Sequence, residues 1–486
     1  MGKFQFGQDA MLKVLTNEQI AEIHKQSLNI LEETGVYFQS QEALELLDKI
    51  GAKVDYETST VRFSKELVED AVRKTPESFT LYNRYKEPVA EVGGNNVYFN
   101  PGSATIQFLE SDGKTVHPTV STDLEKIGQV VESMENITLA SSALTPTDVP
   151  EMIGDACRVY MVLKNSTKPF IGGTFSAEGV GLIHELLSVS AGGSEELRKH
   201  PRMILDICST SPLKWSEIAC ANIFDAARLG MPIEYISVPM IGASSPATIA
   251  GSVIQHTVET LSGIVFAQAV NPGTPVVYGG APMYFDMRYS TTSLNSIETN
   301  LISTAYAQMA KYYGLPTHTY AGLADAKSVD TQAGLETAMS GLIALLSGVN
   351  IISGPGVMDF CNTFSLEKLV VDNDICGMAK RYARGIEFTE ETLAVDLIKE
   401  INHTGDHLST KHTRKWFKKE PFLPSKVIDR RRFGLWQEEG AKDTFALAKE
   451  VVDDILKNKP VPALDPEIEK ALDEVWNRAL KAAAAD

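Results

Sequence analysis

The sequence has few cysteines, and their arrangement excludes a disulfide framework. Its 486 residues contain 5 cysteines, an odd number, scattered from Cys157 to Cys376 with no Cys-x-x-Cys pair. Disulfide-stabilised proteins are instead small, secreted and rich in paired cysteines. No hydrophobic signal region follows Met1-Gly2-Lys3-Phe4. We therefore expect a protein of the reducing cytoplasm.

Long apolar runs, a surplus of positive charge and several common motifs are also missing. No stretch approaches the roughly 18–20 apolar residues that cross a bilayer, so no membrane segment is expected. The net charge is −18, from 45 Lys and Arg against 63 Asp and Glu, whereas nucleic-acid binding needs a basic surface. There is no G-x-x-x-x-G-K-[ST] loop, no G-x-G-x-x-G after a strand and no G-x-S-x-G. These absences argue against nucleic-acid partners, nucleotide-binding loops and a serine hydrolase.

The sequence does contain a repeated alternation of short apolar strands and longer helical stretches. Between Leu315 and Gly356 a strand, a loop, a helix and a second strand follow one another, which implies two parallel strands joined by a right-handed crossover. The eight predicted strands are Val97–Asn100, Thr138–Ala143, Pro169–Gly172, Met203–Ser209, Ile233–Val238, Val276–Tyr278, Thr317–Tyr320 and Val349–Ile352. Eight such units predict an α/β protein, a (β/α)8 barrel.

Helical segments are predicted between these strands and at both ends of the chain. Those between and after the strands are Thr122–Glu135, Met152–Lys164, Gly179–Ser190, Trp215–Leu229, Ile249–Val270, Leu294–Tyr313, Thr331–Ser347 and Leu366–Arg384. We expect an α-rich N-terminal extension over 1–95, the barrel over 96–385 and a helical C-terminal extension over 386–486. The last predicted helix, Pro466–Ala482, has an apolar face that would suit a homo-oligomer.

The loops after the strands of such a barrel form its active face. In this sequence they are rich in glycine, proline and aromatic residues and poor in strong bases. The aromatic residues are Tyr98, Phe99, Phe175, Trp215, Tyr284, Phe285, Phe360 and Phe364. Aromatic rings attract quaternary ammonium groups by about 0.5–2 kcal/mol each, so these residues could form an aromatic box. The alternative is that most of them belong to the core or to a lid.

Lys327 and His318 are two titratable residues at or near a predicted strand. Lys327 could form a Schiff base, as in class I aldolases, or it could pair with Asp325 or Asp330. His318 lies inside a predicted strand near the active end of the barrel. We therefore prefer His318 as the candidate for the active site.

Two further clusters have an ordinary structural explanation beside a functional one. His403, His407 and His412, with Asp406, approach a metal-binding spacing, but Thr404-Gly405 interrupts the helix that would align them. We therefore predict no bound metal.

The basic stretches Lys411–Lys419 and Arg430–Arg432 are typical of a solvated face. The aromatic residues among and after them, Trp416, Phe417 and Phe433, would also suit a docking surface for an acidic partner.

Three longer motifs give the sequence a family resemblance. They are Ala321-Gly-Leu-Ala-Asp-Ala-Lys-Ser-Val-Asp-Thr-Gln-Ala-Gly334, Leu366-Glu-Lys-Leu-Val-Val-Asp-Asn-Asp374, and His412-Thr-Arg-Lys-Trp-Phe417 running into Asp429-Arg-Arg-Arg432 and Gly440-Ala-Lys. With these motifs most of the chain resembles the trimethylamine methyltransferase family. The trimethylamine enzymes of that family carry pyrrolysine, whereas this sequence has only the twenty standard residues. The resemblance is therefore to the branch without pyrrolysine.

The resemblance implies a methyltransferase that demethylates a quaternary amine, with glycine betaine as the first choice. Carnitine, proline betaine and trimethylamine are the alternatives. It also implies that the methyl group passes to the cobalt(I) corrinoid, a cobalamin, of a separate small protein. A quaternary ammonium already contains its leaving group, so the protein must mainly orient the donor and exclude water. Two rival functions stay open from the residues alone: a Schiff-base aldolase on Lys327 and a non-catalytic betaine-binding protein.

The predicted site has two parts and no protein nucleophile, since cobalt would be the nucleophile. The residues predicted to contact the substrate are Tyr98, Asn100, His318, Phe360, Phe364, Tyr284 and Arg288. The residues predicted to face the corrinoid are Gly102, Gly242, Gly280, Asp325 and Lys327. The carboxylate of glycine betaine could be bound by Arg288, His318, Lys327 or backbone N–H groups.

Overall fold

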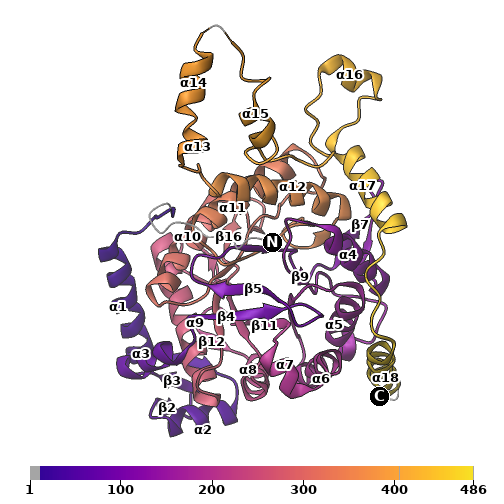
Figure 1. The fold of residues 1–486 in the computed structure, drawn as a ribbon. Coiled ribbons are helices and arrows are strands. Elements are labelled where there is room, and N and C mark those ends of the chain that lie inside the picture. Colours follow the sequence, from indigo (N-terminus) through magenta and orange to yellow (C-terminus); the bar gives the residue numbers. More distant parts are fainter. Residues whose placement is uncertain (1–10, 404, 485–486) are drawn as a thin grey trace.

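The computed structural model describes residues 11–403 and 405–484, and its centre is a set of parallel strands (Figure 1). Within those residues, eight strands pair in parallel with their neighbours in the chain. They are β6 (Tyr98–Asn100), β9 (Ala140–Ser141), β10 (Phe170–Gly173), β11 (Met203–Cys208), β13 (Ile233–Ser237), β15 (Val276–Gly280), β18 (His318–Tyr320) and β19 (Ile351–Ser353). All eight strands predicted from the sequence are confirmed, with ends that coincide or differ by one or two residues.

The eight strands form two sheets whose edges touch. Five strands pair in the order β15-β13-β11-β10-β9, and three in the order β18-β19-β6. At one junction Tyr278 forms an isolated parallel bridge with Thr317. At the other, the backbone N–H groups of Thr138 and Leu139 donate to the Phe99 carbonyl over 2.9 and 3.3 Å. Each strand therefore lies beside its predecessor, and all carboxyl ends face the same end of the molecule.

Helices connect these strands, as the alternating pattern predicts. They are α4 (Ser121–Ser133), the 3-10 turn η2 (Glu151–Ile153), α5 (Gly154–Asn165), α6 (Gly179–Ala191), α7 (Ser194–Lys199), α8 (Glu217–Leu229), α9 (Ile249–Val270), α10 (Ile297–Tyr312), α11 (Thr331–Leu346) and α12 (Leu366–Ala383). Local chemistry fixes their ends. Asp330 accepts from the N–H groups of Gln332 and Ala333 to begin α11, and Gly192 and Gly230 end α6 and α8 with φ of +81° and +71°.

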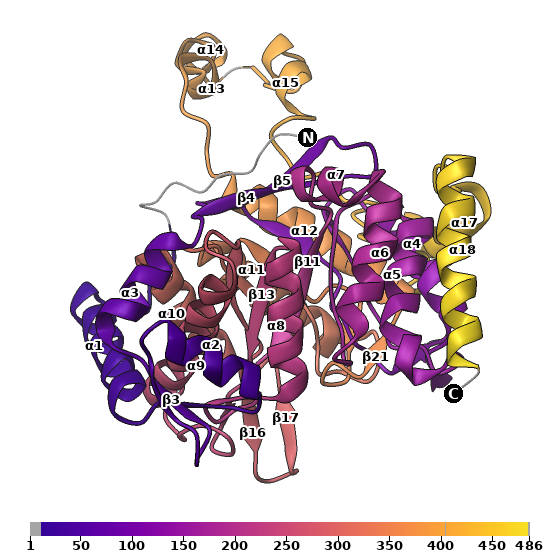
Figure 2. The same ribbon diagram turned by 90° about the horizontal axis from the view of Figure 1, so that it is seen from below.

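A hairpin closes the end of the molecule where the parallel strands begin. It consists of β4 (Ser78–Tyr82) and β5 (Pro88–Gly93). Its Leu81, Ala90 and Val92 form one buried cluster with residues at or near the starts of the parallel strands, namely Tyr98, Leu139, Ile171, Ile204, Val277 and Ile351. Figure 2 shows β4 and β5 at one end of the molecule and β16 (Met283–Asp286) and β17 (Thr291–Ser293) at the other.

Short strands also grow from the loops that follow the parallel strands. One small sheet has the order β14-β16-β17, with β14 at Met240–Ile241. Another has the order β20-β21-β7-β8 and consists of β7 (Gln107–Leu109), β8 (Val116–Pro118), β20 (Val357–Met358) and β21 (Thr363–Phe364). These strands give the loops a fixed course, although the sequence pattern predicted no strands there.

The N-terminal part packs on the long helix α9. It contains α1 (Asn17–Glu33), β1 (Val36–Phe38), α2 (Gln41–Lys49), β2 (Lys53–Asp55), β3 (Thr60–Arg62) and α3 (Lys65–Lys74). Thr16 and Gln19 form a capping box at the start of α1. β12 (Lys214–Trp215) extends this small sheet in the order β12-β1-β3-β2.

The C-terminal part divides into segments that pack on the body and segments that project from it. α17 (Thr444–Asn458) packs on α12 and α4, and α18 (Pro466–Ala483) on α5 and α6. α13 (Glu390–Leu393), α14 (Val395–Ile401), α15 (Lys411–Trp416) and α16 (Phe433–Glu438) project. We call the described residues of 386–443 the arms. Ala394, with a φ of +50°, separates α13 from α14.

The apolar face of α18 is covered by the protein's own body. Leu472, Val475, Trp476 and Ala479 are buried, and Trp476 stacks on Tyr160 with ring centroids 5.1 Å apart. This face is therefore unavailable to a second copy of the chain, so the reason that the sequence offered for a homo-oligomer is wrong. In the part of the chain that the structure describes, no helix has the length and apolarity needed to cross a bilayer.

Candidate functional site

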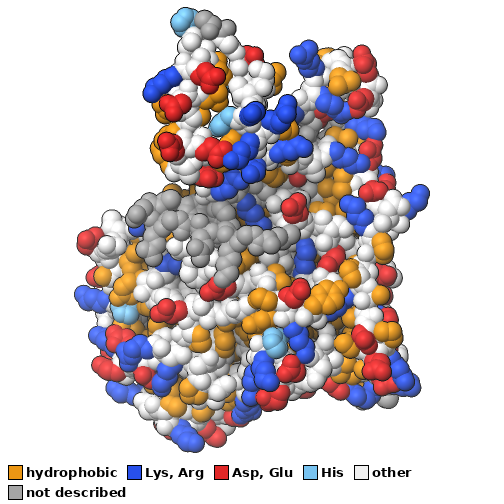
Figure 3. All heavy atoms as spheres, in the orientation of Figure 1, with side chains coloured by type: hydrophobic (Ala, Val, Ile, Leu, Met, Phe, Trp, Pro, Cys, Tyr) orange, Lys and Arg blue, Asp and Glu red, His pale blue; other side chains and the backbone are white. Residues whose placement is uncertain are grey.

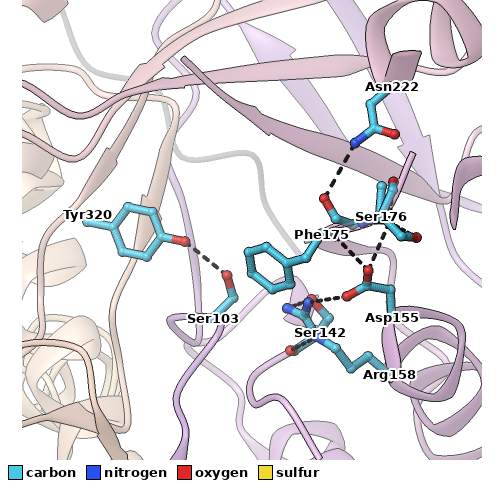
Figure 4. A network of polar contacts seen from close by, with 9 residues as sticks. Ser103, Ser142, Asp155, Arg158, Phe175, Ser176, Asn222 and Tyr320 are labelled. Carbon is cyan, nitrogen blue, oxygen red and sulfur yellow. Dashed lines mark hydrogen bonds and ion pairs between the residues drawn. The ribbon is translucent and has the colours of Figure 1, made fainter. Parts of the chain in front are cut away.

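A cavity of about 310 Å³ lies among the segments that follow the parallel strands. Its walls come from the loop after β6, from α5, from the carboxyl ends of β10, β11, β13 and β18, and from α8. The lining residues with functional groups include Ser103, Arg158, Phe175, Asp206, Asn222 and Tyr320. Ligands of parallel α/β proteins bind outside the carboxyl ends of the strands, so this cavity is the candidate active site (Figure 4).

Asp206 places an unpaired carboxylate in the wall of the cavity. It is the fourth residue of β11 and lies opposite Glu234 of β13 in the parallel register. Its Oδ1 atom is buried and has no hydrogen-bond partner among the described residues. Burial raises the pKa of Asp206 well above its ordinary value, and the neighbouring Glu234 raises it further. A cation bound in the cavity would favour the ionised form of Asp206 and so oppose this rise in its pKa.

A second polar group lies next to Asp206, between the strands. His318 Nδ1 is 3.0 Å from Glu234 Oε1, and His318 Nε2 is 2.9 Å from Ser353 Oγ. Ser353 Oγ in turn donates to Asn100 Oδ1 over 2.8 Å. Because Ser353 uses its proton toward Asn100, Nε2 of His318 must carry the proton that it shares with Ser353. Nδ1 is then the acceptor.

This arrangement calls for a neutral histidine and a protonated glutamic acid. Burial lowers the pKa of His318 to about 4, and burial raises the pKa of Glu234 well above its ordinary value. A protonated Glu234 can donate to Nδ1, so the chain Glu234–His318–Ser353–Asn100 needs no net charge. This chain of contacts links the side chains of β13, β18, β19 and β6. Asp206 is then the acid that faces the cavity.

Two aromatic side chains flank the cavity. The Tyr320 hydroxyl lies 2.9 Å from Ser103 Oγ, and its ring meets the His318 ring edge-on, with centroids 5.2 Å apart. The Phe175 side chain is 60% exposed, and the guanidinium carbon of Arg158 lies 5.4 Å from its ring centroid. Figure 4 shows Tyr320 and Phe175 on two sides of Ser103. A cationic methyl donor could therefore meet ring surfaces as well as a carboxylate.

Arg158 of α5 is held rigidly in the same wall. Its Nε donates to the Ser142 carbonyl over 3.0 Å and its Nη2 to Ser142 Oγ over 2.7 Å. Its Nη1 lies 3.2 Å from Asp155 Oδ1. Asp155 Oδ2 also accepts from Thr174 Oγ1 and from the Phe175 N–H. The cavity thus contains a fixed cation and an unpaired carboxylic acid, an arrangement that suits a small zwitterion.

None of the twelve residues predicted from the sequence lines this cavity, although two lie directly beside it. Asn100 and His318 belong to the buried chain described above. Gly102 precedes Ser103, and a Cβ atom there would lie 2.5 Å from Val357 Cγ2. Tyr98 lies at the opposite end of its strand, in the cluster under the β4–β5 hairpin. Phe364 is fully buried in the core. Neither Tyr98 nor Phe364 therefore lines this cavity.

A second group of predicted residues gathers at the mouth formed by the loops after β18 and β19. Lys327 Nζ lies 3.6 Å from the Phe360 ring centroid and 3.7 Å from Asp359 Oδ1. Asp325 accepts hydrogen bonds from Ser293 and Asn295. Asp359, Phe360 and Cys361 all have a positive φ, of +51°, +56° and +72°. Three consecutive left-handed residues are strained backbone, which is common at functional sites.

Lys327 lacks the surroundings of a Schiff-base lysine. Its side chain is 61% exposed and donates to the Asp325 carbonyl. A lysine that forms a Schiff base is activated by desolvation. The aldolase alternative therefore has no support in the structure.

Four further predicted residues lie apart from the cavity. Tyr284 belongs to β16 in the small sheet. Arg288 is 79% exposed and pairs with Asp286 of the same hairpin, so it is not placed to bind a substrate carboxylate in the cavity. Gly242 follows β14 with a φ of +84°. Gly280 is buried, and a Cβ atom there would lie 2.4 Å from His256 Nε2.

The histidines of the arms form no metal centre in the described ranges 11–403 and 405–484. No group of three or more His, Cys, Asp or Glu side chains there could hold a metal ion. The His412 Nε2 atom lies 3.2 Å from the Glu391 carbonyl.

The residues that the sequence reasoning missed lie inside secondary structure. Asp206 is the only charged residue in the apolar strand Met203-Ile-Leu-Asp-Ile-Cys208, and Glu234 is the only one in Ile233-Glu-Tyr-Ile-Ser237. A lone carboxylate in a buried parallel strand is costly unless it has a function or a partner. That signal could have identified both residues. Arg158 gave no comparable signal, because a helical arginine is common.

Comparisons with known proteins give the family. The chain matches the trimethylamine methyltransferase family (MTTB) over residues 3–483. It is 35% identical to a glycine betaine methyltransferase of Desulfitobacterium hafniense, over 94% of this chain and 95% of that protein. It is also 35% identical to the trimethylamine methyltransferase MttB of Methanosarcina barkeri, over 97% and 96% of the two chains. Among solved structures, the monomethylamine methyltransferase MtmB of Methanosarcina barkeri has the same fold, with a TM-score of 0.54, 13% identity and coverage of 98% and 90%.

Proposed function

The chain belongs to the trimethylamine methyltransferase family, and on that premise we propose that it moves a methyl group from glycine betaine to the cobalt(I) corrinoid of a separate partner protein. The products are dimethylglycine and the methylated corrinoid. Glycine betaine comes first among the quaternary amines because the similar Desulfitobacterium enzyme carries that name. Carnitine, proline betaine and trimethylamine are the alternatives.

We further infer that the eight parallel strands close into a (β/α)8 barrel. The bridge between Tyr278 and Thr317 and the hydrogen bonds to the Phe99 carbonyl support closure at both junctions of the two sheets. In this arrangement residues 1–95 and 386–486 are extensions of a barrel over 96–385. The cavity then lies at the mouth of the barrel, where the chemistry of such folds takes place.

The observation that carries the proposal is the pair of opposite charges in the cavity. Asp206 is positioned to face a trimethylammonium group, and the fixed guanidinium of Arg158 is positioned to face a carboxylate. Tyr320 and Phe175 add ring surfaces for the methyl groups. Trimethylamine has no carboxylate, so Arg158 would keep Asp155 as its only anionic partner among the described residues. A betaine uses both charges, which is why we favour it.

The reaction needs orientation and not proton transfer. The bond between nitrogen and the methyl carbon breaks, its electron pair stays on nitrogen, and the electron pair of cobalt(I) forms the new bond to carbon. No atom of this chain has to supply or remove a proton. Its residues hold the donor so that the N–CH3 bond points out of the cavity, and the aromatic walls limit the access of water.

We propose that the mouth around Asp325, Lys327 and Phe360 faces the corrinoid partner. The exposed Lys327 and the strained turn 359–361 lie on the loops after β18 and β19. Gly242, on the loop after β14, is a further candidate for this contact. Polar and charged groups at a rim are expected to steer association more than to set its affinity.

A substrate panel tests the proposal. The protein is mixed with reduced cobalamin, free or on a corrinoid protein, and each amine in turn, and the methylated corrinoid is followed by its absorbance. We expect turnover with glycine betaine and much weaker turnover with choline, which has the same trimethylammonium group and no carboxylate. Equal turnover of glycine betaine and choline would show that Arg158 does not bind the substrate carboxylate.

The same panel separates the rival functions. No turnover with any betaine would refute the methyl transfer, and tight binding of glycine betaine without turnover would favour a betaine-binding protein. Preferred turnover of carnitine, proline betaine or trimethylamine would show that the methyl donor is another amine. The proposed methyl transfer to a corrinoid would still hold.

A further inference from the structure

One charged side chain is buried in α9, the longest helix that the structure describes. Glu259 is the only Asp, Glu, Lys or Arg among the 22 residues of this helix, and it has no exposed surface. A buried acid in an otherwise uncharged helix is costly unless it has partners or a function. The buried chain that runs from Glu234 to Asn100 does not include Glu259. Its presence in α9 therefore needs an explanation of its own.

The Glu259 carboxylate accepts five hydrogen bonds. Its Oε2 atom accepts from the hydroxyl groups of Ser209, Ser211 and Ser237 over 3.0, 2.8 and 2.6 Å. Its Oε1 atom accepts from the Leu213 N–H and from Gln255 Nε2, both over 3.0 Å. An ionised carboxylate only accepts hydrogen bonds, whereas a protonated one must also donate. The five donors therefore call for the ionised form, and none of them carries a charge that could neutralise it.

Ser209 connects this carboxylate to the cavity. It follows β11, lines the cavity and gives its hydroxyl proton to Glu259. What Ser209 can present to a ligand is therefore the lone pairs of its oxygen. Glu259 also holds the same loop at Ser211 and at Leu213, and Leu213 has a left-handed φ of +54°. Such backbone persists only where its surroundings fix it, so Glu259 fixes the course of this wall.

A buried charge acts on the cavity more strongly than the acidic surface does. The net charge is −18, but on the face of the molecule in Figure 3 acidic and basic side chains are interspersed. Water and salt screen such charges within about 8–10 Å. The Glu259 carboxylate is enclosed by protein, where screening is weaker, and only the Ser209 side chain separates it from the cavity. It therefore gives this wall a negative potential before any ligand binds.

We propose that Glu259 is a positioning residue that acts through Ser209 and makes the cavity select a quaternary ammonium over an uncharged group of the same shape. The Ser209 oxygen then faces the methyl hydrogens of the ammonium, which share its positive charge, and forms weak C–H···O contacts with them. This inference rests on the proposed function, because a quaternary amine must be the ligand. It adds a second acid to the site beside Asp206.

Two ligands of equal shape test the charge separately from the fold. Glycine betaine and tert-butylacetate differ only in the atom that carries the three methyl groups, which is a cationic nitrogen in the first and a neutral carbon in the second. Isothermal titration calorimetry gives both dissociation constants, and their ratio measures the selectivity for charge. Glu259→Gln keeps the shape of the side chain and removes its charge, so it should lower this selectivity about tenfold. Unchanged selectivity would overturn the proposal.

Two further variants separate the charge of Glu259 from its packing. Glu259→Asp keeps the charge and shortens the side chain, so it should disturb the loop after β11 and yet keep most of the selectivity. Ser209→Ala leaves the carboxylate and four of its donors, and it should lower the selectivity about threefold, because the oxygen that faces the ligand is lost. If Glu259→Asp loses as much selectivity as Glu259→Gln, or if Ser209→Ala loses none, the role of Glu259 is structural and the proposal is wrong.

The matched control is Glu367→Gln. Glu367 lies on α12, is 2% exposed, accepts a hydrogen bond from Ser365 Oγ and does not line the cavity. Its replacement removes a buried glutamate as well and should leave the selectivity unchanged; an equal loss there would contradict a specific role of Glu259.

Failure of the proposed function gives a different result. The unaltered protein would then neither bind nor demethylate any quaternary amine. If the unaltered protein demethylates betaine and Glu259→Gln discriminates between the two ligands as well as it does, only the role of Glu259 is refuted.

Discussion

Replacement of Asp206 by asparagine should weaken betaine binding without weakening the fold. The carboxyl group is enclosed by protein, and its Oδ1 atom has no partner in the described chain. At a separation of roughly 5 Å and an effective dielectric constant of about 20, its attraction for an ammonium is about 3 kcal/mol. That corresponds to about a 100-fold rise in Kd for glycine betaine. Thermal stability should stay the same or increase, because the amide replaces a buried acid whose ionised form is costly to desolvate.

The pH dependence of betaine binding is a second test of the role of Asp206. Because the pKa of Asp206 is raised, the free protein holds a proton there over a range in which the bound ammonium favours the ionised acid. Binding should therefore release a proton, and affinity should rise with pH until the free carboxyl ionises. Isothermal titration calorimetry in two buffers of different ionisation enthalpy measures that proton. Asp206→Asn should abolish both the proton release and the slope.

The control for Asp206→Asn is Asp225→Asn. Asp225 lies on α8, its pKa is also raised by burial, and it does not line the cavity. Its replacement removes the same charge and should leave the Kd unchanged. If Asp206→Asn binds betaine as tightly as the unaltered protein, the ammonium does not lie beside this carboxylate, and the assignment of the cavity fails.

Three further substitutions test the fold around the cavity. Burial lowers the pKa of His256 to about 3, so its contribution to stability is lost as pH falls below about 6.5. His256→Phe, which keeps the stacking on Tyr306, should reduce the loss between pH 7 and 4.5 by about 2–3 kcal/mol in urea titrations; an unchanged loss would contradict this. Ala104 has a φ of +64°, a left-handed backbone conformation that is strained for alanine. Ala104→Gly should therefore raise the free energy of unfolding by about 1 kcal/mol in thermal denaturation. A lower Tm would show that the backbone at Ala104 is not strained. A Cβ atom at Gly354 would lie 2.2 Å from the Ala321 carbonyl oxygen, so Gly354→Ala should cost about 2 kcal/mol and reduce turnover; unaltered stability would show that these loops can separate.

Most of the central fold was predictable because its signals are local. Each parallel strand is a short apolar run between polar or glycine-rich segments, and the connecting helices have capping residues such as Ser216 and Asp330. α9 begins and ends where the pattern places it. The small strands of the loops were not predictable, because strands of two to four residues depend on partners outside their own sequence. The break at Ala394 likewise has no sequence signal, because alanine normally favours helix.

The site was predicted less well, because loop position alone does not tell which way a side chain points. Phe175 was among the predicted rim aromatics and lines the cavity, and Gly102 was predicted next to Ser103, which also lines it. Tyr98 was assigned to the same rim although it starts its strand and therefore lies at the other end. The acids of β11 and β13 lie within their strands, whereas the predicted rim consists mainly of loop residues. The sequence neighbours of both acids are apolar, which is itself the sign of an inward-facing polar residue.

The hairpin over the start of the parallel strands has a kinetic consequence. Because β4 and β5 pack against the starts of the parallel strands, the cavity is closed at that end. The methyl donor and the methyl acceptor must then enter from the same side. For the proposed reaction the small amine has to arrive first and the bulky acceptor second. An excess of the acceptor should then inhibit the reaction by forming a non-productive complex with the free enzyme. Dimethylglycine should dissociate only after the acceptor has dissociated.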